Sequence, residues 1–257
     1  MNPFLFIFSL IALLLLPISV NSQVGAVYSD PVHPLRLLSE TPGQERSLQI
    51  SYASPYGIAS LADFGIAYYQ PVKRGVIIAD LNWLGLTGYY KYHIGLGYAI
   101  VPGKSFMAGL SLHAEILPGL DPGHRRIIPG SSIFTCFNYR EMIITRLRLD
   151  NLTAMFASPG FPLREALFSA STRLTARDDI NIICGLSYAK GRSPLFRAGI
   201  SILAMTKHEI AAGMQSGPAG FWVAYRLSLI KLDFLFTIQT SGVFGYEPGT
   251  SLKFFLD

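Results

Sequence analysis

The chain of 257 residues is poor in charge and has no long hydrophobic run after its first 22 residues. Only 14% of its residues are charged, whereas about 25% is usual for soluble domains. Even so, 50% of the residues are hydrophobic and the mean hydropathy is +0.37. A membrane-spanning helix needs roughly 18 consecutive apolar residues, so helical spans are excluded beyond residue 22. Hydrophobicity spread this thinly is typical of a transmembrane β-barrel, where alternate residues face lipid.

Cysteine is also scarce, with Cys136 and Cys184 as the two examples. The alternation described below puts them on opposite faces of a barrel wall, so a disulfide between them is not expected. Neither has a second Cys or a His at metal-ligand spacing, and we expect no metal or cofactor. The pI near 9.2 could suggest a nucleic-acid partner, but export and the barrel pattern argue against one.

The clearest pattern lies between Tyr92 and Ile116. Tyr92–Ile100 and Phe106–Ile116 each alternate a large apolar residue with a small or polar one, and the segment 102–104 separates them. A period of two indicates β-strands, and about ten residues is the length of a tilted strand that crosses a bilayer. This stretch therefore predicts a membrane β-hairpin.

The same alternation recurs along the chain and predicts an all-β fold, a transmembrane antiparallel β-barrel of about 14 strands. Longer loops are expected at 118–130 and 154–162. The alternative is a soluble β-sandwich or lipocalin-like barrel, but the residues opposite the apolar face are largely Gly, Ala and Ser rather than charged. The expected strands are Ser47–Ser54, Asp63–Gln70, Val76–Leu84, Tyr92–Ile100, Phe106–Ile116, Ser132–Arg140, Glu141–Asn151, Glu165–Thr175, Asp179–Tyr188, Leu195–Leu203, His208–Met214, Phe221–Leu229, Leu232–Gln239 and Thr250–Leu256.

The N-terminal residues read as an export signal. Phe4–Val20 is apolar, and small residues precede a cleavage position before Gln23, although Lys and Arg are absent from the first residues. An uncleaved signal anchor is the alternative. We therefore expect a signal peptide at 1–22, an irregular periplasmic or plug segment at 23–46, and an outer-membrane barrel at 47–257.

Charged residues on the small-residue face would line the barrel lumen. They either pair internally and brace the wall, or form a basic lumen that favours an anionic ligand. His113 and Glu115 share one face of a strand, but a lone pair of this kind is weak evidence for a metal or for acid-base catalysis. Since no nucleophile or phosphate-loop motif is present, we expect no enzyme. The candidate lumen-lining residues are His113, Glu115, Arg140, Arg146, Arg148, Arg173, Arg197 and Arg226.

The segment Ser47–Ile116 carries a resemblance to a known group. Its early strand ends in a Pro-Tyr interruption, and an aromatic-rich strand, the strand YYKYHIGLGYAI and the Gly-containing strand FMAGLSLHAEI follow. This order resembles the PorV/PorQ-like accessory proteins of type IX secretion in Bacteroidota, which are themselves similar to the FadL-like long-chain fatty-acid transporters. The Asn-Pro-Ala start expected near the mature N-terminus is missing, and Asp30-Pro31 stands there instead. No functional residue is carried over.

The resemblance implies a non-enzymatic outer-membrane barrel that serves as an accessory or binding component of surface-protein export. Its partners would then be outer-membrane lipid and secretion-system or other outer-membrane proteins. The alternative is an outer-membrane channel for hydrophobic or anionic small molecules such as fatty acids.

Overall fold

A computed structural model describes residues 45–54, 62–86, 89–103, 105–118, 125–140, 142–152, 166–189, 193–216, 219–241 and 245–256. The expected signal peptide and nearly all of the segment 23–46 lie outside these ranges. The strands are β1 (Ser47–Ala53), β2 (Ala62–Val72), β3 (Gly75–Leu86), β4 (Tyr89–Gly103), β5 (Phe106–Pro118), β6 (Arg125–Tyr139), β7 (Ile143–Asp150), β8 (Leu167–Arg177), β9 (Ile180–Ala189), β10 (Leu195–Ala204), β11 (His208–Gln215), β12 (Gly220–Ser228), β13 (Leu232–Ser241) and β14 (Gly245–Phe255).

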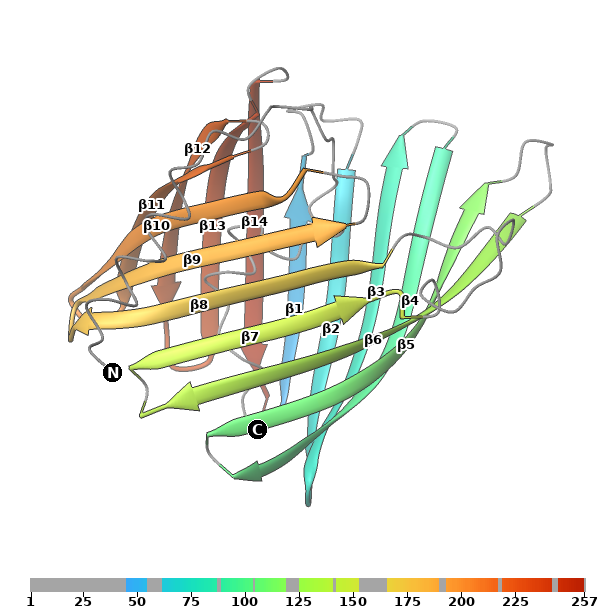
Figure 1. Cartoon of the computed structure of the whole chain (residues 1–257), viewed down its shortest axis with the longest axis horizontal. Helices are drawn as coiled ribbons and strands as arrows, with labels where there is room; N and C mark the ends of the chain where they lie inside the picture. Colours follow the sequence, from blue (N-terminus) through green and yellow to red (C-terminus); the bar gives the residue numbers. More distant parts are fainter. Residues whose placement is uncertain are drawn as a thin grey trace.

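These strands form one closed antiparallel barrel in which each strand pairs with its sequence neighbours (Figure 1). The first and last strands close the ring, and their register joins Ser47 to Phe255 and Ala53 to Gly249. Among the described residues, no helix is long and apolar enough to span a membrane. The closed ring of antiparallel strands β1–β14 confirms the predicted fold class, a 14-stranded antiparallel barrel.

The two faces of the wall differ as the alternation predicts. On the hairpin β4–β5 the outward side chains of Leu96 and Leu112 are 61% and 62% exposed. The inward side chain of Glu115 is 4% exposed, and His93 is also buried. An apolar exterior combined with a polar interior is the arrangement of a membrane barrel and the reverse of a soluble one. The predicted lipid-facing sides of this hairpin are confirmed.

The prediction of a loop at 118–130 is wrong for residues 125–130, because β6 begins at Arg125. Pro129 and Gly130 lie within this strand and pair with Ala114 and His113 of β5. Proline and glycine usually weaken a strand, which is why the sequence suggests a loop here. Gly130 is required for packing, since a Cβ at this position would collide with the imidazole of His113.

The two ends of the barrel carry connections of different length. At one end, the β2–β3, β4–β5, β6–β7, β8–β9, β10–β11 and β12–β13 connections each contain two or three residues. At the other end, the connections reach 16 residues between β7 and β8. Outer-membrane barrels have short periplasmic turns and longer extracellular loops, so the short-turn end corresponds to the periplasmic side.

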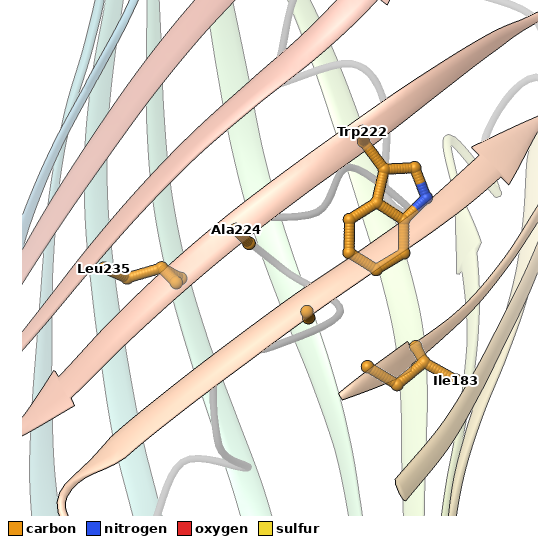
Figure 2. Close-up of a cluster of buried hydrophobic side chains, with 5 residues drawn as sticks. Ile183, Trp222, Ala224 and Leu235 are labelled. Atoms are coloured by element: carbon orange, nitrogen blue, oxygen red, sulfur yellow. The ribbon is translucent and has the colours of Figure 1, made fainter. Parts of the chain in front are cut away.

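Inside the wall, Trp222 of β12 lies across the neighbouring strands and is completely buried (Figure 2). A Cβ added at Gly199 or Gly213 would come within 2.5 Å or 2.6 Å of its indole ring. The indole ring therefore packs directly on the backbone of these two glycines. It belongs to the same buried cluster as Ile183 on β9. A separate small cluster contains Ala99, Met107 and Cys136.

We expect Gly213→Ala to lower the free energy of unfolding by about 1–3 kcal/mol, the usual cost of overpacking. The new methyl group would collide with the Trp222 ring and with the carbonyl oxygen of Ala198. Urea unfolding in lipid vesicles, followed by tryptophan fluorescence, measures this change. Gly103→Ala is the matched control, because a Cβ there meets nothing within 4 Å. Equal stability of the two variants would contradict close packing of Trp222 on Gly213.

Candidate lumen site

The inward-facing charges are nearly balanced in number. Eight cationic side chains and seven carboxylates point inward from the described strands, as the alternation of each strand assigns them. The cations are Lys91, Arg126, Arg146, Arg148, Arg173, Arg197, Arg226 and Lys253. The carboxylates are Asp63, Asp80, Glu115, Asp150, Glu209, Asp233 and Glu247.

A first cluster joins β3, β4 and β5 and is centred on His93. Its Nε2 atom lies 3.2 Å from Asp80 Oδ2, and its Nδ1 atom lies 3.7 Å from Glu115 Oε1. Lys91 Nζ lies 3.4 Å from the same Glu115 oxygen, and the ring of His113 stacks on His93 with centroids 4.9 Å apart. The imidazole of His93 thus lies between the two carboxylates, and the ammonium group of Lys91 lies beside Glu115.

Two glycines leave the space that the side chains of this cluster occupy. A Cβ at Gly95 would collide with the carboxylate of Asp80, and one at Gly130 would collide with His113. Because Gly130 has no side chain, His113 reaches past β6 and its Nε2 atom lies 3.1 Å from Asn151 Oδ1. His113 and Glu115, although two residues apart on β5, therefore engage different partners and do not form one ion pair.

The β7 end of this region holds a second ion pair. Arg148 Nε donates to Asp150 Oδ1 at 2.7 Å. Ser132 Oγ donates to the same oxygen at 2.5 Å. Arg146, two residues before Arg148 on β7, faces inward beside Cys136, its register partner on β6.

A third cluster is centred on Glu209 of β11, which is almost completely buried. Arg173 Nη2 donates to its Oε1 atom at 2.8 Å, and Ser201 Oγ donates to the same atom at 2.6 Å. Arg226 Nη1 lies 3.7 Å from its Oε2 atom, and Arg226 Nη2 donates to Asp233 Oδ2 at 2.7 Å. A buried carboxylate needs this many donors to offset the water it has lost.

A fourth cluster links β10 to β14 through amide side chains. Arg197 donates to Gln215 at 3.0 Å and to Gln239 at 3.1 Å. Gln239 in turn donates to Glu247 at 2.5 Å. Gln239 therefore links Arg197 of β10 to the carboxylate of Glu247 on β14.

The eight candidate residues do not all lie in the lumen. His113, Glu115, Arg146, Arg148, Arg173, Arg197 and Arg226 face inward. Arg140 does not, because it is an exposed turn residue with φ of 49°. Its guanidinium lies 5.4 Å from the ring centroid of Tyr139, a residue exposed on the outer face. Assigning Arg140 to the lumen was wrong, since the strand alternation ends at Tyr139.

Several lumen residues escape prediction from the sequence. Glu247 lies in β14, which begins at Gly245 rather than at Thr250. Gln215 and Asn151 are polar but uncharged, so a search for ionisable residues passes over them. Extending each alternation to its full strand length would have found Glu247.

The inward charges are unevenly distributed around the barrel. Four arginines face inward from β7, β8 and β10, against one carboxylate, Asp150, from β7–β10. On β2–β5 three carboxylates face inward with one lysine, Lys91. We call the first surface the basic wall (Arg146, Arg148, Arg173 and Arg197) and the second the acidic wall (Asp63, Asp80 and Glu115).

Comparison with known proteins supports the fold. No protein-family model and no curated protein matches the chain. A bacterial polysaccharide outer membrane secretin aligns over 83% of this chain and 99% of its own, with 8% identity and a TM-score of 0.54. The outer membrane protein Omp33 of Acinetobacter baumannii aligns over 82% and 97%, with 8% identity and a TM-score of 0.50.

A KdgM porin aligns over 82% of this chain and 99% of its own, with 9% identity and a TM-score of 0.49. At such low identity, the likenesses to the polysaccharide secretin and to Omp33 concern the fold alone. The chain has the fold of an outer-membrane β-barrel. Together with the apolar outer face, this fold places the protein in the outer membrane.

We expect Glu209→Ala to lower the free energy of unfolding by about 3–5 kcal/mol, because it leaves buried arginine charge without its carboxylate. Unfolding in urea from lipid vesicles measures the loss. The matched control is Asp179→Ala, which removes an exposed partner of Arg177 at 3.9 Å and should change little, as surface ion pairs do. A Glu209 variant as stable as this control would show that the third cluster does not brace the wall.

Proposed function

We propose that the protein is an outer-membrane channel for small anionic molecules. The observation that carries the proposal is the division of the inner face into a basic wall and an acidic wall. Rings or rows of fixed charge inside a pore select the ions that pass it. A solute carboxylate would follow the four arginines of the basic wall, and the acidic wall would repel it.

The polar character of the interior favours an anionic solute over a purely hydrophobic one. Most of the buried apolar residues described inside the barrel lie in two small clusters, around Trp222 and around Ala99. Charged and amide side chains occupy the rows between them. A fatty acid would find its headgroup partners on the basic wall, but the described apolar surface for its chain is short.

The internal pairing is compatible with this function. Arg148 and Arg173 each bind one carboxylate, and such pairs fix the positions of the guanidinium groups. A fixed row of cations offers a passing anion successive weak sites, which conduction requires. The bracing role and the selective role therefore use the same side chains.

Charge reversal on the basic wall tests the channel. The double variant Arg146→Glu, Arg148→Glu should shift the reversal potential of planar-bilayer currents from anion preference toward cation preference. Arg177→Glu is the control, because this residue is exposed at the end of β8, next to the β8–β9 turn, and should leave selectivity unchanged. Unaltered selectivity in the double variant, or no conductance from folded protein, would count against the proposal.

The accessory role in surface-protein export stays a prediction that rests on the resemblance of Ser47–Ile116. Affinity purification of the full chain from its native outer membrane tests it. Secretion components recovered in fixed proportion would favour this role. Their absence, together with selective conductance, would favour the channel.

A further inference from the structure

Two neighbouring turns at the short-turn end expose large apolar side chains. They are 205–207, between β10 and β11, and 229–231, between β12 and β13. Met205 is 87% exposed and Ile230 is 93% exposed, the two highest values among the exposed large hydrophobic residues of the described chain. The backbone N–H of Ser228 donates to the carbonyl oxygen of Lys207 at 2.8 Å. The turns therefore form one surface, which we call the rim patch.

Turn geometry does not explain these side chains. Met205 and Thr206 have φ of 53° and 59°, and tight hairpin turns with two positive φ values favour Asn and Gly. The chain accepts strained backbone at both positions and still carries a methionine at the tip. A side chain kept where the turn disfavours it and where no described residue covers it points to an external partner.

The charge of the rim patch is of one sign. Lys207 and Lys231 are exposed, and neither turn contains Asp or Glu. The neighbouring β8–β9 turn differs, since it holds Asp178 and Asp179, and Arg177 pairs there with Asp179. The rim patch therefore suits an anionic partner.

The rim patch continues the lipid-facing surface of the barrel. Ile202 and Ile210 are outward and exposed on β10 and β11, and Leu229 begins the second turn. His208 Nδ1 lies 2.7 Å from the hydroxyl of Tyr225 on the same outer face, which is typical of the interfacial girdle. The apolar tips and the two lysines lie just beyond this girdle, at the level of lipid headgroups.

We propose that the rim patch binds anionic phospholipid of the inner leaflet. The ammonium groups of Lys207 and Lys231 would contact the lipid phosphate, while Met205 and Ile230 would insert beside the upper acyl carbons. Basic residues next to apolar ones at a membrane surface attract anionic lipid in this way. The inference is independent of what the lumen transports.

Native mass spectrometry of the folded full chain in detergent, titrated with phosphatidylglycerol, tests the proposal. Removing two cations near a headgroup should weaken binding roughly 30-fold, so the double variant Lys207→Gln, Lys231→Gln should lose retained lipid. Phosphatidylcholine should bind both forms weakly. Arg177→Gln, at the same end of the barrel, should bind phosphatidylglycerol like the parent protein.

A second measurement separates insertion from simple charge attraction. Ile230→Cys in a Cys136→Ser, Cys184→Ser background can carry a polarity-sensitive fluorophore. In vesicles containing phosphatidylglycerol its emission should shift to the blue, and Lys207→Gln, Lys231→Gln should reduce that shift. Emission typical of water, or equal lipid retention in the double variant and the parent, would overturn the proposal and leave a soluble acidic partner as the occupant.

Discussion

Hydrogen bonding of the backbone in lipid is the constraint on which this structure depends. Because hydrocarbon offers no donors or acceptors, a membrane strand must bond on both sides, and only a closed barrel gives every strand two neighbours. Here closure is made by β1 and β14, whose pairing continues over all seven residues of β1. The low charge content and the absence of long apolar runs follow, since each strand needs only every second residue to be apolar.

Closure gathers most polar side chains of the strands into one interior, where their sizes matter as much as their charges. Asp80 lies against Gly95 and His113 lies against Gly130, so each large polar side chain crosses a strand that offers no Cβ. The indole of Trp222 likewise lies over Gly213, where a Cβ would collide with the ring. Glycine in these strands therefore weakens local strand propensity but makes cross-strand polar contacts possible.

The fold was predictable because alternation is a local property that survives in any part of a strand. Strand ends were less predictable, as β6 shows, where Pro129 and Gly130 suggest a loop but lie in the wall. The site was predictable only in part. The alternation along each strand places Arg173 and Arg226 inside the barrel. It does not reveal that both contact Glu209, because that contact depends on the register of the strands from β8 to β12. The prediction for Arg140 is wrong because the alternation of a strand does not continue into the turn that follows it.

Bracing of the barrel wall favours inward charges that are paired, whereas ion selectivity requires an excess of one sign. The uneven distribution of the charges around the barrel allows both. If every cation were matched by a carboxylate on an adjacent strand, the wall would be rigid and the interior field would be small. Here Arg173 pairs with Glu209 on β11 and Arg148 pairs with Asp150. Asp150 is the one carboxylate that faces inward from the described parts of β7–β10, beside the four arginines of the basic wall. The positive charge of that wall is therefore larger than the negative charge of the same strands. A field that crosses the lumen is the direct consequence, and it requires no charge to be left without a partner.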